Sequence, residues 1–464
     1  MNYVTVIGLE IHAELLTKSK IFCSCKNSFG GGANERICPI CCGLPGSLPR
    51  LNKEAVKLAV LAGGALGCKI NNYSAFDRKN YFYPDLPKAY QITQFEYPIC
   101  GEGMTEAGNK SYRIERIHLE EDAGKLIHEG AVSKADYNRC GVPLIEIVTK
   151  PDFGSAEEVC EFVHETALRL KYAKVCDARL EQGSIRADVN ISVMPEGASE
   201  LGTRTEIKNL NSYKSIKKAI EYEAARQISV IESGGRVKRE TLRFDGEKTI
   251  SMRTKEGADD YRYFPEPDIL PVALSDEEIG EILKQLPKMP RERIFEYVRK
   301  GVPKTDAELI AEDREFCNYY EAAAVMSGNF RETAKLMLGS FSRELNAGDG
   351  AIPFEADKLA ALVKLICENK ISRNSASDIM TEMFKTCGEP EEIAQRGNMI
   401  LEENKEETEL AAKKVIKENP KAVADYKNGN KKSFGFLMGA LMKSMPKSAN
   451  PKTAKEILGA LLEN

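Results

Sequence analysis

The hydrophobic pattern of the chain changes its period near residue 270, and this change limits the folds that the chain can adopt. Before that point apolar residues alternate with polar ones, as in VTVIGLEIHAE at residues 4–14, and Gly-rich turns separate such runs. After residue 275 apolar residues recur at helical spacing, as in DEEIGEILKQL and DKLAALVKLI. The sequence therefore predicts an α+β protein in which a mixed sheet comes first and helices follow.

The length of the chain predicts more than one domain, because 464 residues are too many for a single hydrophobic core. Three prolines between residues 265 and 271 accompany the change in pattern, and a later break ends in Asn419-Pro420. We expect three domains, at residues 1–290, 291–405 and 406–464.

Neither end of the sequence predicts a membrane segment. The N-terminal MNYVTVIGLEIHAELL has no basic start and reads as a strand, and no apolar run approaches the roughly 20 residues that span a bilayer. We therefore expect a cytoplasmic protein without membrane contact.

Charge is distributed unevenly along the chain. The net charge is −4, but residues 411–464 contain eleven Lys against four Asp or Glu. A basic C-terminal module on an acidic body is typical of a remote grip on RNA. A solvated, lysine-rich helical surface would give the same composition, and charge alone does not separate the two.

Four predicted strands carry polar faces of an unusual kind. Side chains alternate along a strand, so residues two apart share a face. The polar residues that share a face are Glu10, His12 and Glu14; His118 and Glu120; Arg186, Asp188, Asn190 and Ser192; and Arg204, Glu206 and Lys208. Ordinary solvent-exposed faces favour Thr, Lys, Ser and scattered charges, whereas these combine acids with His, Arg, Asn and Lys.

Two interpretations of these faces stay open at this level. They are either exposed to solvent, or they line one concave sheet that binds Mg²⁺ through carboxylates and phosphate through Arg and Lys. The sequence has neither G-x-x-x-x-G-K-[ST] nor G-x-G-x-x-G. Any ATP would therefore bind on an open sheet.

Four of the thirteen cysteines have the spacing of a metal site. Cys23 and Cys25 form one pair, and twelve residues later Cys38 and Cys41 form a second pair on a Gly-rich loop. This spacing is typical of a closed, tetrahedral structural zinc site. Reduced free cysteines are the alternative, and Cys42 is a spare.

Longer blocks of the sequence resemble one known family, the B subunits of tRNA-dependent amidotransferases (GatB). The blocks are GLEIHAELLTKSKIFC, CPICCGLPGSLPRLN, RKNYFYPDLPKAYQITQFEYPI, IHLEEDAGKLIH, YNRCGVPLIEIVTKPD, EQGSIRADVNISV, GTRTEIKNLNSY and DYRYFPEPD. The C-terminal KNGNKKSFGFLMGALMKSMPKSANP resembles the family's tail, which small YqeY-type proteins share. The blocks follow one another over nearly the whole chain.

The resemblance implies a glutamine-synthetase-like cradle domain with the cysteine loop at 23–41, then a helical domain and a YqeY-like tail that grip tRNA. It implies that ATP and Mg²⁺ phosphorylate the side-chain carboxylate of Glu or Asp esterified to tRNA(Gln) or tRNA(Asn). Ammonia from an amidase, the A subunit of the same complex, then displaces the phosphate, and a small C subunit braces the complex.

The resemblance also implies a set of site residues. The implied catalytic residues are Glu10, His12, Glu120, Glu121, Glu146, Arg186, Asp188, Glu206 and Lys208. The implied cofactor-binding residues are His118, Glu181, Asn190, Asn209 and Asn211. The implied metal ligands are Glu10, His12 and Glu121 for Mg²⁺, and Cys23, Cys25, Cys38 and Cys41 for Zn²⁺.

Two other functions are consistent with parts of the sequence. A non-catalytic, zinc-stabilised tRNA-binding subunit would leave the polar strand faces without a purpose. A stand-alone ATP-dependent ligase for small amino acids would leave about 190 C-terminal residues without one. No serine-lysine amidase signature occurs, so the chain should need a partner to use glutamine. The sequence does not decide between Glu-tRNA and Asp-tRNA as substrate.

Overall fold

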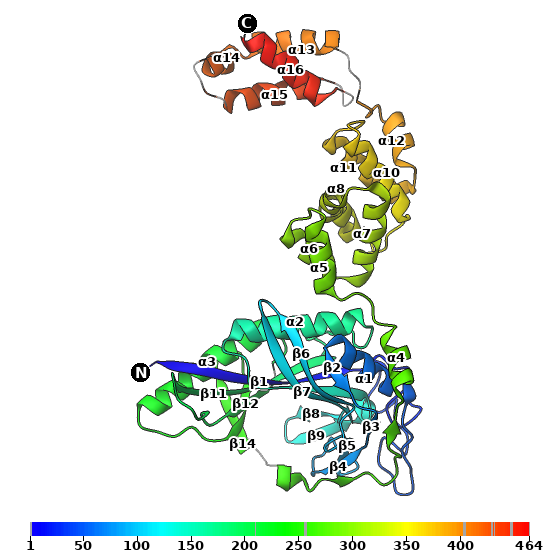
Figure 1. The fold of residues 1–464 in the computed structure, drawn as a ribbon, viewed down its shortest axis with the longest axis vertical. Coiled ribbons are helices and arrows are strands. Elements are labelled where there is room, and N and C mark those ends of the chain that lie inside the picture. Colours follow the sequence, from blue (N-terminus) through cyan, green and yellow to red (C-terminus); the bar gives the residue numbers. More distant parts are fainter. Residues whose placement is uncertain are drawn as a thin grey trace. The chain divides into compact units, whose positions relative to one another are not determined.

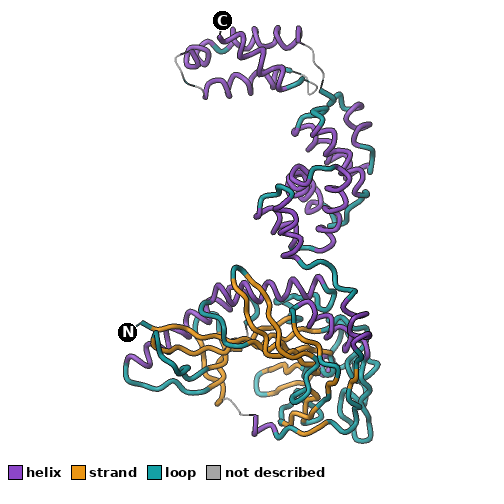
Figure 2. Tube along the Cα trace, in the orientation of Figure 1, coloured by secondary structure: helices purple, strands orange, loops and turns teal. Residues whose placement is uncertain are grey.

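The chain forms two compact units, Met1–Met289 and Pro290–Asn464. The computed structural model describes residues 2–208, 210–254, 258–401, 405–427, 430, 432–445 and 449–463. Within these residues, strands occur only in the first unit, and the second unit is built of helices (Figures 1 and 2). The predicted α+β class, with a mixed sheet before an all-helical part, is confirmed.

A nine-stranded sheet forms the centre of the first unit. Its order in space is β14-β13-β12-β11-β1-β10-β7-β6-β2, and all neighbours are antiparallel except the parallel pair β12–β13. The strands are β1 (Tyr3–Glu14), β2 (Cys68–Ile70), β6 (Cys100–Ala107), β7 (Lys110–Glu121), β10 (Pro143–Thr149), β11 (Ile185–Pro195), β12 (Thr205–Lys208), β13 (Glu240–Phe244) and β14 (Thr249–Thr254).

Three helices cover one face of this sheet, namely α1 (Lys53–Ala65), α2 (Ala156–Tyr172) and α3 (Tyr213–Glu232) (Figure 1). The apolar residues of the alternating strands, including Ile7, Leu9 and Ile11, are at most 1% exposed and join the helices in one hydrophobic cluster. Burial of this face fixes which side of each strand is polar.

Small sheets lie on other parts of the first unit. They are β15-β4-β5, β16-β3 and β8-β9. The strands are β3 (Tyr73–Ser74), β4 (Asp77–Asn80), β5 (Tyr90–Thr93), β8 (Lys125–Glu129), β9 (Val132–Asp136), β15 (Phe264–Pro265) and β16 (Val272–Ala273), with 3₁₀ turns η1 (Tyr137–Arg139) and η2 (Ala258–Tyr261). Thr93 of β5 donates a hydrogen bond to Glu120 of β7 at 3.3 Å, so β5 lies over the polar face of the large sheet.

Helix α2 begins directly after a capping serine. Ser155 is its N-cap and accepts a hydrogen bond from the backbone N–H of Glu158 at 3.2 Å. The expected return bond of a capping box is shifted by one residue, because the Glu158 carboxylate accepts from Gly154 N at 2.9 Å. The same carboxylate also pairs with Lys110.

The second unit contains only helices among its described residues. After α4 (Asp276–Leu283) of the first unit come α5 (Pro290–Arg299), α6 (Lys304–Ala311), α7 (Arg314–Ser327), α8 (Phe330–Leu336), the π-helical η3 (Met337–Phe341), α9 (Ser342–Ala347), α10 (Ala356–Cys367), α11 (Arg373–Thr386), α12 (Pro390–Arg396), α13 (Lys405–Glu418), α14 (Pro420–Lys427), α15 (Lys432–Ser444) and α16 (Pro451–Glu463). The predicted helices of DEEIGEILKQL and DKLAALVKLI are α4 and α10.

The second unit has two separate hydrophobic clusters. One extends from Tyr297 to Ala394 and the other from Ala412 to Leu462. This separation supports a helical domain and a tail, whose boundary near residue 405 stays a prediction. Among the described residues, none of the helices combines the length and the apolar character needed to cross a membrane.

An aromatic stack under the sheet should be essential to the first unit. Phe153 is 1% exposed and stacks on Tyr112 with ring centroids 4.4 Å apart, while Phe162 meets its edge at 5.0 Å. We expect Phe153→Ala to lower the free energy of unfolding by about 3–5 kcal/mol, because it opens a cavity in the core. Calorimetry of the full chain should show the first unit's transition at lower temperature.

The matched control is Phe29→Ala, at a side chain that is 80% exposed. It should change the free energy of unfolding by less than about 0.5 kcal/mol. Equal effects of the two substitutions would contradict the assignment of Phe153 to the core.

Candidate functional site

A row of histidines and acids crosses the central strands of the large sheet. His118 on β7 lies opposite Glu146 on β10, and Glu146 lies opposite His12 on β1. His12 in turn lies opposite Arg186 on β11. Residues directly opposite each other in antiparallel strands have Cβ atoms about 4.5–5.5 Å apart, so these side chains form one continuous polar row.

A second row runs beside the first, two residues along the same strands. Glu10 on β1 lies opposite Asp188 on β11. One further step along β11, Asn190 lies opposite Glu206 on β12. The period of two that places these residues on the polar face also keeps them away from the helices on the other face.

Two residues of the first row, together with Glu120 two residues further along β7, form a group with metal-ligating atoms. His12 Nε2 lies 3.6 Å from Glu120 Oε1 and 3.5 Å from Glu146 Oε2, and the ligand atoms of the three residues lie within 4.8 Å of one another. His118 Nε2 contacts the same two carboxylates, at 3.2 Å from Glu146 Oε2 and 3.6 Å from Glu120 Oε2. We call His12, Glu120 and Glu146 the histidine group.

The imidazoles and carboxylates of the histidine group shift each other's pKa values. Burial by itself lowers the pKa of His12, but the carboxylates of Glu146 and Glu120 outweigh it and raise that pKa to about 9. Burial likewise raises the pKa of Glu146, but the two imidazoles outweigh it and hold the pKa well below its usual value. A divalent cation could replace the proton on His12, because two carboxylates and one imidazole are a suitable donor set.

The second row contains a group of three acids. Carboxylate oxygens of Glu10, Asp188 and Glu206 lie within 4.8 Å of one another. Asn190 Nδ2 donates to Glu10 at 3.0 Å, and Lys208 Nζ donates to Asp188 Oδ2 at 2.8 Å. Burial opposes the charge of Lys208, but Asp188 and Glu206 outweigh it and raise its pKa. One ammonium among three acids leaves negative charge that suits a hard cation with oxygen ligands. We call Glu10, Asp188 and Glu206 the acidic group.

Two cavities open on these groups. The histidine cavity, of about 330 Å³, is lined by His12, Lys79, Tyr81, Gln91, Glu120, Asp122, Ala123, Leu144, Glu146, Arg186, Ala187, Asp188, Lys208, Leu210 and Asn211. The arginine cavity, of about 490 Å³, is lined by Val6, Gly8, Leu9, Glu10, Glu115, Val148, Thr149, Pro151, Asn190, Ser192, Leu201, Gly202, Thr203, Arg204 and Arg239. Because Glu10 lines one cavity and its neighbour Asp188 lines the other, the acidic group lies where the two cavities meet.

Arg186 is held in place at the wall of the histidine cavity. Its guanidinium nitrogen donates to Asp122 Oδ2 at 2.6 Å, and Arg139 lies 3.4 Å from the same oxygen. Burial disfavours the charge of Arg186, but Asp122 outweighs it and raises its pKa. Arg186 therefore brings a fixed positive charge to the cavity.

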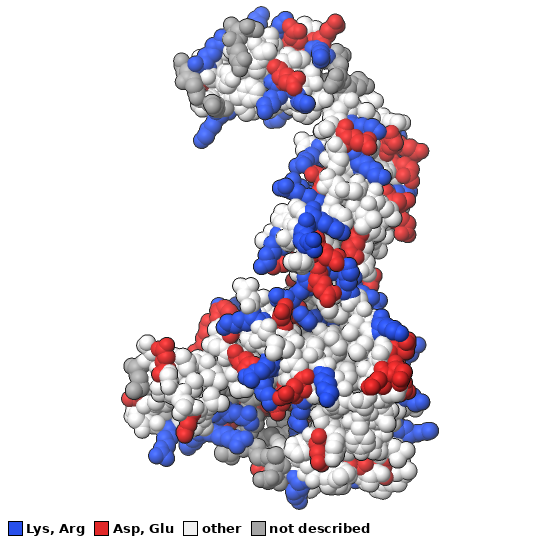
Figure 3. All heavy atoms as spheres, viewed as in Figure 1, with Lys and Arg blue, Asp and Glu red and all other residues white. Residues whose placement is uncertain are grey.

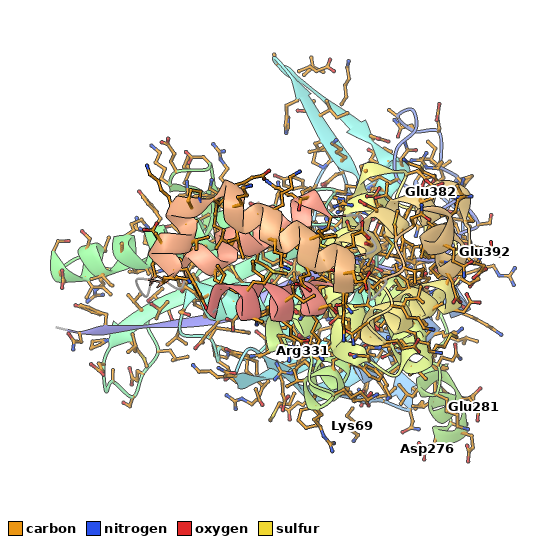
Figure 4. The ribbon with its side chains drawn as sticks, turned by 90° about the horizontal axis from the view of Figure 1, so that it is seen from above. Lys69, Asp276, Glu281, Arg331, Glu382 and Glu392 are labelled. Atoms are coloured by element: carbon orange, nitrogen blue, oxygen red, sulfur yellow. The ribbon has the colours of Figure 1, made fainter. Side chains whose placement is uncertain are left out.

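Two acids of these groups are far more buried than the acids on the surface of the first unit. Asp276 and Glu281 on α4 are exposed and lie on the outer surface (Figure 4). Glu120 and Glu206 are only 3% and 5% exposed. Burying carboxylates in this way costs free energy unless partners or cations compensate, which is why such groups indicate a functional site.

The four predicted zinc ligands lie together. The sulfur atoms of Cys23, Cys25, Cys38 and Cys41 are all within 4.8 Å of one another. Cys41 Sγ accepts from the backbone N of Cys38 at 3.2 Å, and its pKa falls to about 4 because the Cys23 thiol donates to it and the ammonium of Lys20 lies near. A thiolate in a set of four sulfurs fits a structural zinc ion.

Two of the predicted residues, Glu121 and Glu181, neither contact the two groups through their side chains nor line the two cavities. Glu121, the last residue of β7, pairs with Lys88 and accepts a hydrogen bond from Ile92 N of β5 at 3.0 Å. Of the two neighbouring glutamates, only Glu120 lines the histidine cavity, and Glu121 lines neither of the two cavities. Glu181 is exposed in the turn before β11 and lines neither cavity. Asn209, a third predicted residue, lies outside the described residues.

The cavity residues that sequence reasoning missed include Lys79, Tyr81 and Asp122. Lys79 lies on β4, which has only four residues, too few for a period of two to stand out. Only the resemblance to the family could have indicated these three residues, because they lie in the blocks RKNYFYPDLP and IHLEEDAGK.

Comparison with known proteins supports a single family for the whole chain. Residues 5–280 match the model of the GatB/GatE catalytic domain, and residues 318–462 match that of the GatB domain. A protein of Ruminiclostridium cellulolyticum, named as the B subunit of aspartyl/glutamyl-tRNA(Asn/Gln) amidotransferase, is 50% identical over 99% of this chain and 97% of its own length. Proteins with the same name from Caldicellulosiruptor bescii and Clostridium tetani are 47% and 44% identical, over 100% and 99% of this chain and 100% and 98% of their own lengths.

The cysteine group gives a prediction about bound metal. Purified protein should carry about one zinc ion per chain, and Cys38→Ser should lose most of it because one of four thiolates is gone. Cys42→Ser is the control and should keep its zinc, since Cys42 is outside the group of four. Elemental analysis of the variants measures both, and equal zinc contents in the two would contradict the assignment.

Glu14 gives a prediction about pH, because burial raises its pKa to about 7 and Asp122 adds to the effect. The folded protein thus binds this proton more tightly than the unfolded chain, and the stability from Glu14 falls as pH rises from 4.5 through 7. Glu14→Gln should therefore stabilise the protein at pH 8 by on the order of 1–2 kcal/mol and have little effect at pH 5. Thermal unfolding at both pH values tests this, with Glu200→Gln as the exposed control. Equal shifts at the two pH values would contradict it.

Proposed function

Because the chain belongs to the GatB family, the B subunits of aspartyl/glutamyl-tRNA(Asn/Gln) amidotransferases, we propose that it carries the site at which a misacylated tRNA is amidated. The substrate is Glu or Asp esterified to tRNA(Gln) or tRNA(Asn), and the reaction uses ATP. The observation that supports this best is the meeting of the histidine group, the acidic group and two cationic side chains at two adjoining cavities.

The reaction needs an activated carboxyl group, because a free carboxylate is a poor electrophile. A carboxylate oxygen of the amino acid attacks the γ-phosphorus of ATP, and ADP leaves. The product is an acyl phosphate. Ammonia then attacks the acyl carbon, inorganic phosphate leaves, and a proton is lost. In such phosphoryl transfers the protein acts chiefly by positioning the reactants and stabilising charge.

The shapes of the two cavities support a division of substrates between them. The arginine cavity has apolar walls at Val6 and Leu201 and two guanidinium groups, Arg204 and Arg239, which suit a nucleoside and its phosphates. The histidine cavity is polar and takes the aminoacyl end of the tRNA. The γ-phosphate then lies at the acidic group, where the cavities meet.

The two groups of ligating residues suit divalent metal ions. His12, Glu120 and Glu146 would hold one Mg²⁺, and Glu10, Asp188 and Glu206 a second. Bound Mg²⁺ would neutralise charge on the phosphate oxygens. Lys208 and the fixed guanidinium of Arg186 add positive charge from the protein itself. In this proposal Glu120 is a metal ligand in place of Glu121.

The relatives are named as subunits, and we propose that this chain likewise works in a complex, with a glutamine-hydrolysing A subunit that supplies ammonia and a small C subunit. Helices α13–α16 and their links, in which residues 411–464 hold eleven Lys against four Asp or Glu, bind the tRNA through its phosphates. Figure 3 shows basic side chains spread over the visible surface of these helices, among fewer acidic ones.

The test uses the purified complex with γ-labelled ATP and each misacylated tRNA, without an ammonia source. Wild type should transfer label to Glu-tRNA, Asp-tRNA or both. Glu10→Gln should reduce the transfer by about 100-fold or more, since it removes charge from the acidic group while keeping its shape.

Glu102→Gln is the matched control, because the Glu102 side chain is 80% exposed and lines neither cavity. It should transfer label as wild type does. If the complex with Glu10→Gln still transfers label to misacylated tRNA at the wild-type rate, the chain is a non-catalytic tRNA-binding subunit.

A further inference from the structure

Lys79 on β4 brings a positive charge to the histidine cavity that the proposed reaction does not yet use. Three Lys or Arg side chains line this cavity, and two of them are already paired, Arg186 with Asp122 and Lys208 with Asp188. Among the described residues, no carboxylate lies within 4.0 Å of the Lys79 ammonium. Its charge is therefore available to an anion that enters the cavity.

Aromatic rings surround this ammonium in place of acids. Lys79 Nζ lies 4.8 Å from the centroid of the Tyr261 ring and 5.9 Å from that of Tyr81. The two rings meet edge to face at 6.0 Å. Next to them, Tyr263 stacks on Phe95 with centroids 4.2 Å apart. Ring faces attract a cation without cancelling its charge, so they hold the ammonium in place and leave it positive.

Tyr261 and Tyr263 come from a segment far away in the sequence, residues 260–268, which we call the tyrosine strap. Arg78 binds Glu266 with two hydrogen bonds of 2.7 and 3.0 Å. Asn80 donates to the backbone oxygen of Arg262 at 2.8 Å. Both anchors are on β4, on either side of Lys79, so the strap is tied to the strand whose lysine it surrounds.

The electrostatic surroundings keep Lys79 charged. Burial by itself lowers the pKa of the ammonium, but Tyr263, Glu120 and Glu146 together outweigh it and raise that pKa above its usual value. The carboxylates of Glu120 and Glu146 form no ion pair with the Lys79 ammonium. They therefore stabilise its positive charge from a distance and leave it able to bind an anion.

We propose that Lys79 binds the side-chain carboxylate of the esterified amino acid, and that the tyrosine strap positions its ammonium for this contact. The proposal rests on the amidation reaction of the proposed function. A carboxylate that enters the histidine cavity meets Glu120, Glu146 and Asp188, which repel it. An unpaired ammonium on the same wall offsets that repulsion and selects an amino acid with an acidic side chain.

The decisive measurement separates the acyl substrate from the nucleotide. In the label-transfer assay with the full complex, Lys79→Met should lower kcat/KM for the misacylated tRNA by about 10- to 100-fold, the loss expected for one charge-assisted hydrogen bond. The KM for ATP should stay within about twofold of wild type, because ATP binds on the other side of the acidic group. Affinity for uncharged tRNA should be unchanged.

Lys69→Met is the matched control, because Lys69 on β2 is exposed and lies on the outer surface (Figure 4). It should behave as wild type in all three measurements. Lys79→Arg keeps the charge and should recover part of the lost activity.

The positioning role of the strap has its own pair of variants. Tyr261→Phe keeps the ring face beside Lys79 and should retain most of the activity, whereas Tyr261→Leu removes the face and should lose about 5- to 30-fold in kcat/KM. These variants keep the proposal testable if Lys79→Met fails to fold. Equal activities of Tyr261→Phe and Tyr261→Leu would overturn the role of the strap.

The outcomes for the two proposals differ. If wild type transfers no label to any misacylated tRNA, the proposed function fails, and this inference fails with it. If wild type transfers label and Lys79→Met does so equally well, only the role of Lys79 is overturned. A rise in KM for ATP at unchanged kcat would also overturn it, by assigning Lys79 to the nucleotide.

Discussion

The candidate site depends on the antiparallel register of the four strands β7, β10, β1 and β11. In this register His118, Glu146, His12 and Arg186 form one row, and a shift of a single residue in any strand would turn that strand's charged side chains toward the helices. The apolar residues on the other face are almost fully buried. Burial of the core therefore selects the register, and the polar rows follow from it.

Charge compensation determines what this polar face can do. Buried acids are stable only with partners, and here histidines, Lys208 and Asn190 supply part of the compensation. The remaining negative charge suits divalent cations, and the cations fixed at the cavity walls suit a phosphate and a carboxylate. The tyrosine strap adds a cation that ring faces hold in place. These charged groups are in place before any substrate binds. Such preorganised groups stabilise the charge that develops in the transition state of a reaction.

Long strands made much of the site predictable, and short ones hid the rest. β1 and β11 have 12 and 11 residues, enough for the alternation to mark Glu10, His12, Asp188 and Arg186 as neighbours on a polar face. The resemblance to the B-subunit family, confirmed over the whole chain, added Glu146 on β10. β4 is too short to show a period, and Tyr261 reaches Lys79 from some 180 residues further along the chain. No local pattern connects two such residues.

The sequence by itself determined the α+β class, the change to helices after residue 275, the polar faces of the long strands and the cysteine spacing, because each is a property of residues close together in the chain. Tertiary structure alone decided that Glu120 and not Glu121 lines the histidine cavity, that Asp122 fixes Arg186, and that the strap surrounds Lys79. These contacts join strands and loops distant in sequence. Their geometry is set by packing of the whole core, which no short segment contains.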